Sequence, residues 1–373
     1  MTDVEIFDRE TRHLGGRLTI PSSDPLAIRG YSHVRKVAEV LINSANQLLP
    51  DLAGVYFDFV RNPEINAFAF KSEDRYFIGI TAGAFYMLEL VIMRMLSDSR
   101  VFTIIGNPGE ECELPPLTIY APHSQRMFKA GNIAQSPKTP ARHAYAVNLI
   151  ESAIRFLVGH EIAHITLGHV DYMKSKTGAA LIAEVGARAA DKERLIERQC
   201  MEIHADTRSV FSGIESVRLT HKFAGSTPSA WSRKALTEAQ LIFDWASAMN
   251  LLFRLFGDAR FSPARLCTTG YPPLPVRRLL ASNYAFGWVV EKWDSGLREK
   301  ARNALRAAMQ HTEFAFATIL GQRPNWGGIH DALAADSQAH VKRVVEDSIA
   351  LQHQLIPYCY ERLMHLDEHA VVQ

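Results

Sequence analysis

The chain has 373 residues, which is enough for one large domain or two of ordinary size. Hydrophobic residues make up 47% of it and the formal net charge is +1, a balance typical of globular proteins. The absence of a basic excess or basic cluster argues against a nucleic-acid partner, and neither a secretory signal nor a membrane span is predicted. The scattered cysteines predict free thiols in a reducing, cytoplasmic environment; they are Cys112, Cys200, Cys267 and Cys359.

The N-terminal part is predicted to contain a flexible arm, a helix and a small sheet. Residues 1–30 include a Gly-Gly pair and two prolines, which indicate a loosely structured arm. Apolar residues then recur at helical spacing over residues 32–49. Three runs of β-forming residues predict an antiparallel meander over residues 55–60, 65–70 and 76–81. Thr81 is expected to cap a helix that ends near residue 96.

A long connection separates this part from the most informative helix. Residues 105–140 are rich in glycine, proline and charge, and they either cover a cleft or contain short strands. Thr139 and Pro140 then predict a helix start, as an N-cap and a first-turn proline. Apolar residues recur at helical spacing through residues 144–167, and Gly168 is placed to end the helix.

This helix carries the pattern His160-Glu161-Ile162-Ala163-His164. Residues i and i+4 lie on one helix face, so both imidazoles can bind a single metal ion. With the carboxylate of Glu161 beside the first imidazole, the pattern predicts a zinc site that contains its own general base. The alternative is a buried helix in which these side chains are only hydrogen-bonded.

A catalytic zinc usually has three protein ligands, so a third ligand is required. Glu202 and Asp206 share a face of a later helix, with the small Ala205 between them. We expect Glu202 to bind the metal and Asp206 to accept a hydrogen bond from a ligand imidazole. His204 lies on a different face and is not expected to be a ligand. His169 either supports a ligand or adds a favourable charge at a helix end.

These two motifs resemble those of the gluzincin peptidases that include HtpX and the CAAX prenyl endopeptidases, in which H-E-x-x-H precedes Glu-x-x-x-Asp. Residues 65–70 resemble the edge strand beside the cleft of such enzymes; the alternative is an ordinary internal strand. Residues 271–277 resemble their His-Pro-Pro…Arg segment, with Tyr271 in place of the histidine. The resemblance covers about residues 62–280. A soluble relative with a similar plan is the phage-exclusion protease Lit.

The resemblance implies a zinc-dependent endopeptidase of the α+β class, mostly helical. Its zincin-like core would have a small antiparallel sheet beside the metal helix, and its C-terminal part would be helical. A protein or peptide substrate is expected to pair with the backbone of Asn66 and Ala67. Tyr271 or Arg277 is expected to donate to the oxyanion, and the alternative for Tyr271 is a role in packing alone. A defence or toxin role like that of Lit is an open hypothesis that leaves the chemistry unchanged.

Residues 31–290 are accordingly expected to form the metallopeptidase domain, and residues 291–373 a helical extension for packing, substrate selection or self-association. After a short loop at residues 169–177, further helices are predicted over residues 235–256, 297–320 and 330–366. A rival function remains open: a catalytically silent, zinc-stabilised interaction module. Such a protein would keep the metal ligands without hydrolysing a substrate.

Overall fold

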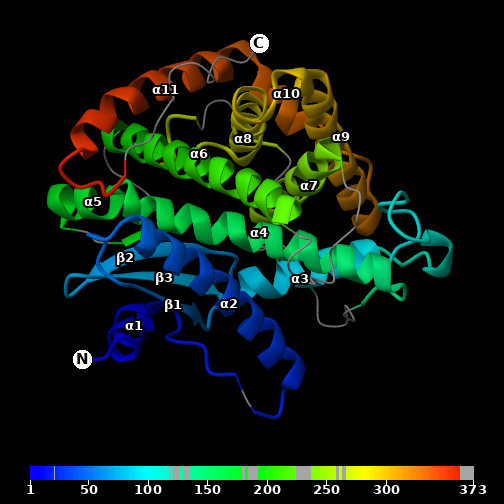
Figure 1. Cartoon of the computed structure of the whole chain (residues 1–373), viewed down its shortest axis with the longest axis horizontal. Coiled ribbons are helices and arrows are strands. Elements are labelled where there is room, and N and C mark those ends of the chain that lie inside the picture. Colours follow the sequence, from blue (N-terminus) through cyan, green and yellow to red (C-terminus); the bar gives the residue numbers. More distant parts are fainter. Residues whose placement is uncertain are drawn as a thin grey trace.

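The structure is a computed structural model and describes residues 1–20, 22–117, 119–120, 127–128, 135–178, 181–183, 192–223, 237–257, 260–262 and 266–361. This part of the chain is mostly helical and contains a small sheet, so the expected α+β class is confirmed. The sheet lies on one side of the long helix α4 (Pro140–Thr166), and α6 (Lys192–Phe223) lies on the other (Figure 1). The two helices that carry the metal motifs are therefore neighbours in the middle of the molecule.

The N-terminal residues form a helix where a loosely structured arm is expected. In α1 (Asp3–Thr11), Thr2 and Glu5 form a capping box. Its Ile6 and Phe7 are fully buried against the sheet. A helix this short is marginal alone, so the tertiary contact stabilises it, and that contact leaves little trace in the local pattern. The next elements are η1 (Arg12–Leu14) and α2 (Pro25–Leu48), which begins earlier than predicted.

The sheet is mixed, so the predicted antiparallel meander is wrong. Its strands are β1 (Val55–Val60), β2 (Ala67–Ser72), β3 (Arg75–Thr81) and β6 (Leu181–Ala183), in the order β1-β3-β2-β6. Glu73 and Asp74 have positive φ and form the tight hairpin turn between β2 and β3. β1 instead pairs in parallel with β3. That pairing depends on a crossover and on tertiary contacts, which the alternation of side chains does not encode.

β2 is not the edge strand that the sequence analysis expects. β6 pairs with its residues 68–70, so this stretch is interior. A strand of only three residues gives too weak a sequence signal to be predicted. Asn66 and Ala67 come before the stretch that β6 covers: the backbone of Asn66 bonds Thr81, and Ala67 pairs with Ile80.

Both faces of the sheet are buried, because successive side chains enter two different cores. Ala67 and Ala69 belong to the main core, which also contains residues of α2 and α4. Phe68 and Phe70 belong to a smaller core with α1. Gly79 of β3 leaves room for the Phe68 ring, since a Cβ at Gly79 would lie 2.5 Å from ring carbons.

The helix α3 (Ala82–Leu96) begins as predicted, with the Thr81 side chain accepting a hydrogen bond from the N–H of Ala84. Arg142 of α4 organises the chain that follows α3. Its guanidinium donates to the carbonyl oxygens of Leu96, Asp98, Val101, Phe102 and Ile105. The connection then contains η2 (Pro108–Glu110), β4 (Ile119–Tyr120) and β5 (Met127–Phe128), so short strands are present; residues 121–126 and 129–134 lie outside the described chain.

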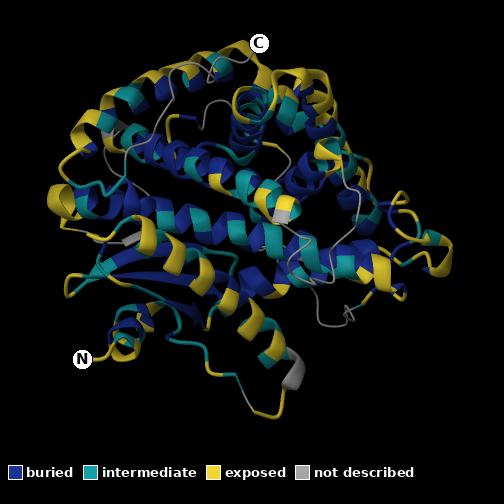
Figure 2. Ribbon diagram, in the orientation of Figure 1, coloured by how far each residue is buried: buried dark blue, intermediate teal, exposed yellow. Residues whose placement is uncertain are grey.

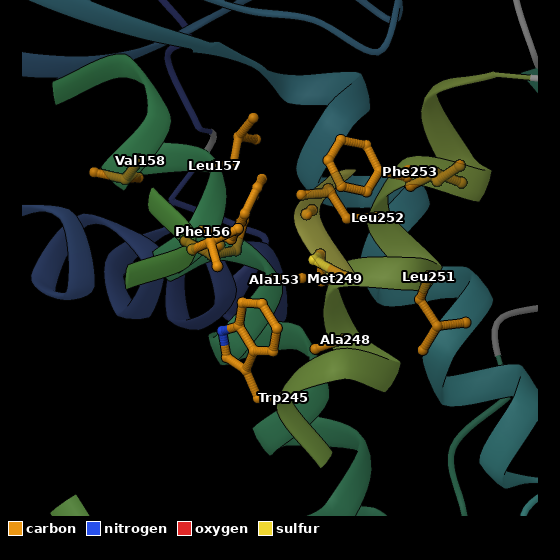
Figure 3. Close-up of a cluster of buried hydrophobic side chains, with 14 of the residues drawn as sticks. Ala153, Phe156, Leu157, Val158, Trp245, Ala248, Met249, Leu251, Leu252 and Phe253 are labelled. Carbon is orange, nitrogen blue, oxygen red and sulfur yellow. The ribbon is translucent and has the colours of Figure 1, made fainter. Parts of the chain in front are cut away.

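The helix α7 (Glu238–Phe256) packs against α4 in the main core (Figure 3). The rings of Phe156 and Phe253 meet edge to face, with centroids 5.5 Å apart. Trp245 and Met249 of α7 are buried in the same cluster. Each large apolar side chain buried in this way contributes about 1.5–3 kcal/mol to folding. Burial is concentrated on α4 and its neighbours, whereas α11 shows an exposed outer face (Figure 2).

The last elements are α8 (Leu274–Trp288), the π-helical turn η5 (Val289–Trp293), η6 (Ser295–Leu297), α9 (Arg298–Leu320), α10 (Gly327–Leu333) and α11 (Ala335–Leu355). The helix predicted over residues 330–366 is thus two helices, broken at the extended Ala334. Residues of α9 and α11 share the main core with α4, and the expected domain boundary at residue 290 stays a prediction. None of the helices in the described chain is long and apolar enough to cross a membrane.

Candidate metal centre

Small residues bring the two motif helices together. Ala163 of α4 and Ala205 of α6 are fully buried against each other in one cluster with Leu167. Nearby, the Ser209 hydroxyl of α6 donates to the carbonyl oxygen of Phe156 at 2.6 Å. Side chains longer than alanine between the helices would hold them further apart. This close approach lets side chains of α6 reach the imidazoles of α4.

Three side chains from these helices form a group that could hold a metal ion: His160, His164 and Glu202. The Nε2 atoms of the two histidines are 3.0 Å apart. The Glu202 carboxylate lies 3.4 Å from Nε2 of His160 and 3.5 Å from Nε2 of His164. Around a tetrahedral zinc with bonds of about 2.0–2.1 Å, ligand atoms are separated by about 3.3 Å. The separations present are close to these values, with a different oxygen of Glu202 near each histidine nitrogen, so the three side chains could hold a zinc ion.

The opposite nitrogen of His160 faces a carboxylate. His160 Nδ1 lies 3.0 Å from Asp206 Oδ1, and Arg277 of α8 holds Asp206 through two bonds of 2.7 Å. Burial alone would raise the pKa of Asp206, but the Arg277 guanidinium and His160 hold that pKa below its usual value. Asp206 is therefore a carboxylate that accepts the Nδ1 proton of His160, which leaves Nε2 unprotonated toward Glu202.

The opposite nitrogen of His164 faces another imidazole. His164 Nδ1 lies 2.9 Å from Nδ1 of His169, the first residue of α5 (His169–Thr177). Residues 169–177 are a helix and not the predicted loop, because Gly168, with φ 78°, reverses the chain and lets a new helix start at once. Burial, reinforced by the neighbouring His160 and His169, lowers the pKa of His164 well below its usual value.

His204 lies beside His169, with the two rings stacked at a centroid distance of 5.6 Å. Burial lowers the pKa of His169 well below its usual value and that of His204 to about 4. Both rings are thus neutral. The interpretation of His169 as a favourable charge at a helix end is therefore wrong, because His169 starts a helix and is buried and uncharged.

The other expected site residues lie on three different parts of the structure. Glu161 is on α4 next to His160 and is only 1% exposed. Tyr271 lines a small cavity together with Glu202 and Met201, which places it beside the candidate ligands. Ala67 is the first residue of β2 and Asn66 directly precedes it, on the sheet that packs against α4.

The sequence analysis did not specify two contacts of the centre, although it allowed His169 to support a ligand. Arg277 and Asp206 are 71 residues apart in the chain, and no spacing rule connects them. The contact between His164 and His169 joins residues five apart, which do not share a face of one continuous helix; only the glycine between them, at position 168, hints at a reversal. Both contacts depend on where α5 and α8 pack.

One comparison with known proteins gives a match. The model of peptidase family M48 matches residues 31–213, a region that contains the sheet, the H-E-x-x-H pattern and Glu202 with Asp206. The matched region ends before Tyr271 and Arg277. No curated protein and no solved structure matches the chain.

Proposed function

The chain is a zinc metallopeptidase, and on this premise we propose that it is an endopeptidase whose zinc is held by His160, His164 and Glu202. The observation that carries the proposal is the buried group of two imidazole nitrogens and one carboxylate at the separations of a tetrahedral ion. We further propose a zincin-like, gluzincin-type core. It is supported by the pairing of a metal helix that ends in H-E-x-x-H with a second helix that supplies a glutamate.

Glu161 is the proposed general base. His160, His164 and Glu202 would hold a zinc ion, which would acidify a water molecule and polarise a carbonyl group. The carboxylate of Glu161 then accepts a proton from the attacking water and delivers it to the nitrogen of the leaving amine. Burial of Glu161 beside His160 supports this role, because the low-dielectric site excludes competing solvent and strengthens its charge interactions.

Tyr271 and Arg277 are the proposed donors around the reacting carbonyl. Tyr271 shares a cavity with Glu202, so its hydroxyl is the better supported oxyanion donor. Arg277 uses Nε and Nη2 to hold Asp206, and its Nη2 lies 3.5 Å from Glu202. We propose that Arg277 acts mainly by orienting these two carboxylates.

The substrate is proposed to be a protein or peptide in the cytoplasm. The free thiols of Cys112, Cys200, Cys267 and Cys359 fit a reducing compartment. Ala67 is the proposed site of backbone pairing with substrate, since β6 leaves this end of β2 uncovered. Asn66 is proposed to flank this contact, because its backbone N–H and carbonyl groups are already bonded to Thr81. A defence or toxin role, by similarity to the plan of Lit, is the biological hypothesis that accompanies this chemistry.

A specific observation favours a second candidate function. His160, Glu161, His164 and Glu202 are all at most 2% exposed, so a peptide reaches them only if the site opens. A catalytically silent zinc module, or an enzyme that stays latent until a partner opens it, would have such a closed centre. Both readings share the same metal ligands, and they differ in whether hydrolysis occurs.

The test is the Glu161→Gln variant, which removes the base and keeps every proposed ligand. Wild type and variant are loaded with zinc and incubated with unfolded casein and with a library of random peptides, and products are identified by mass spectrometry. We expect cleavage by wild type and a loss of at least about 10³-fold in the variant, with equal zinc content. Equal cleavage by both would remove Glu161 as the base, and no cleavage by either would favour the silent module.

A further inference from the structure

His169 is held against the metal helix by a local reversal of the chain. The helix α4 ends at Thr166 with Leu167 as its C-cap, and Gly168 adopts φ 78°, so His169 starts α5 and turns its ring back toward His164. A Cβ at Gly168 would lie 2.6 Å from the backbone of Tyr358. The reversal is therefore also enclosed by the C-terminal segment, residues 356–361, which follows α11. The contact between His164 Nδ1 and His169 Nδ1, at 2.9 Å, is therefore built into the fold.

A single proton occupies this contact, and its position decides whether His164 can bind a metal. If the proton is on His164, Nε2 of His164 carries a lone pair and can be a ligand. If it is on His169, neutral His164 carries its proton at Nε2, which blocks coordination. Because Nε2 of His164 faces His160 and Glu202, metal binding requires that His169 accept at Nδ1 and carry its own proton at Nε2.

We propose that His169 is a positioning residue: it accepts the Nδ1 proton of His164 and so fixes the tautomer and the ring orientation with which His164 meets the metal. This inference rests on the ligand set of the proposed function. Each histidine ligand then has its own partner at Nδ1. Asp206 faces Nδ1 of His160, and His169 faces Nδ1 of His164. Mutation of a hydrogen-bond partner of this kind typically lowers metal affinity by 10–100-fold.

The next layer of the structure holds His169 in turn. The ring of His204 stacks on it, and Nε2 of His204 lies 3.1 Å from the carbonyl oxygen of Ser348 in α11. That carbonyl oxygen can only accept a hydrogen bond, so Nε2 of His204 carries the proton and the backbone of α11 fixes the His204 tautomer. The series His164, His169, His204 and Ser348 therefore connects the metal centre to α11.

A role in packing alone explains His169 poorly. His169 Nε2 and His204 Nδ1 are both buried, and neither has a hydrogen-bond partner among the described residues. Buried polar atoms without partners destabilise a fold, so an aromatic hydrocarbon ring would serve packing better at both positions. An imidazole at position 169 is instead explained by the acceptor that it offers to His164.

The test measures zinc affinity of the full-length apoprotein by competition with a chromophoric chelator. His169→Phe keeps a ring but offers no acceptor, and His169→Asn offers an acceptor without the ring. We expect His169→Phe to bind zinc 10–100-fold more weakly and His169→Asn to remain within about threefold of wild type. His143→Phe, an exposed substitution on the same helix, is the control that should leave affinity unchanged.

Cobalt substitution gives a readout that does not depend on activity. The visible absorption of bound Co²⁺ should change in His169→Phe and should return to the wild-type spectrum in His169→Asn. Circular dichroism of each apoprotein shows whether it folds, and His169→Ala replaces the phenylalanine variant if that one does not.

Three outcomes distinguish a failure of the positioning role of His169 from a failure of the proposed metal-ligand set. Wild-type affinity and spectrum in His169→Phe, or in His169→Ala, would overturn the positioning role. An equal loss in His169→Asn would also overturn it, because the acceptor would then not be the cause. His160→Ala tests the ligand set independently: if it binds zinc as tightly as wild type, the proposed function itself fails.

Discussion

Asp58 is a buried carboxylate on β1 whose partners come from separate parts of the chain. Arg17 and Tyr56 hydrogen-bond to it, and Arg35 of α2 forms a second ion pair. Burial would raise the pKa of Asp58, but Arg17, Tyr56 and Arg35 together hold it below its usual value. The stabilisation is therefore present above the unfolded pKa of about 4 and is lost as pH falls through the lower folded value.

We predict that Asp58→Asn lowers the free energy of unfolding at pH 7 by about 1–3 kcal/mol and flattens its decline below pH 4. Urea unfolding between pH 7 and pH 3 measures both quantities. Asp51→Asn, at an exposed position, serves as the control and should leave the curve unchanged. A parallel decline of wild type and Asp58→Asn in acid would contradict this account.

Arg142 is completely buried and satisfies five backbone carbonyls after α3. A lysine has three donors on one atom, so it cannot reach all five. We predict that Arg142→Lys lowers the free energy of unfolding by about 2–4 kcal/mol, measured by thermal and urea unfolding. Arg306→Lys, at an exposed position on α9, should have an effect near zero. Equal effects at the two positions would show that the five bonds do not stabilise the fold.

For contacts between individual residues, the sequence predicts those within one helix and misses those between residues far apart in the chain. His160 and His164 could be paired because residues four apart share a face. Glu202 can reach these two histidines only if α4 and α6 pack closely, and the small Ala205 indicated such packing. The contact of Arg277 with Asp206 depends on the position of α8, and nothing in the local pattern specifies it.

The end of α4 is the element on which both the metal centre and the C-terminal segment depend. Gly168 has φ 78°, and its backbone lies against Tyr358. The carbonyl oxygen of Thr166 accepts hydrogen bonds from the N–H groups of Tyr360 and Glu361. The C-terminal segment thus satisfies a carbonyl that the helix leaves unpaired.

We predict that Gly168→Ala is more destabilising than Gly178→Ala. Both glycines have positive φ, so each alanine bears the left-handed strain of about 1–2 kcal/mol. A Cβ at Gly178 meets nothing within 4 Å, whereas one at Gly168 meets the Tyr358 backbone at 2.6 Å. Thermal unfolding compares the two variants, and hydrogen exchange at Tyr360 reports the displaced segment. Equal unfolding midpoints with unchanged exchange would contradict the close approach.

Elements with caps and long apolar stripes were predictable from the sequence. The start of α3 follows from the Thr81 cap, and the start of α4 follows from Pro140. Thr139 stands at the N-cap position of α4, but its side chain makes no capping hydrogen bond. The short α5 was missed because its nine residues are largely polar and lie between two glycines, a pattern that also describes a loop. The parallel pairing of β1 and the presence of β6 were missed because both arise from packing and not from local alternation.

The whole molecule is arranged around α4. The sheet and α2 pack on it, α6 and α7 cover other faces, and its buried character is visible along most of its length (Figure 2). The proposed ligands come from α4 and α6, and the groups that orient them come from α5, α6 and α8. Zinc would therefore connect separate elements, and its binding should raise the thermal stability of the folded state by mass action.

The measurement that tests the central claim most directly is the zinc content of the purified protein, determined by elemental analysis. Wild type is compared with His160→Ala, Glu202→Ala and, as a control on α4, His143→Ala. We predict one equivalent of zinc in wild type and in His143→Ala, and loss or strong weakening in the other two. Wild type without zinc, even after zinc is added, or full retention of zinc by both ligand variants, would contradict the account.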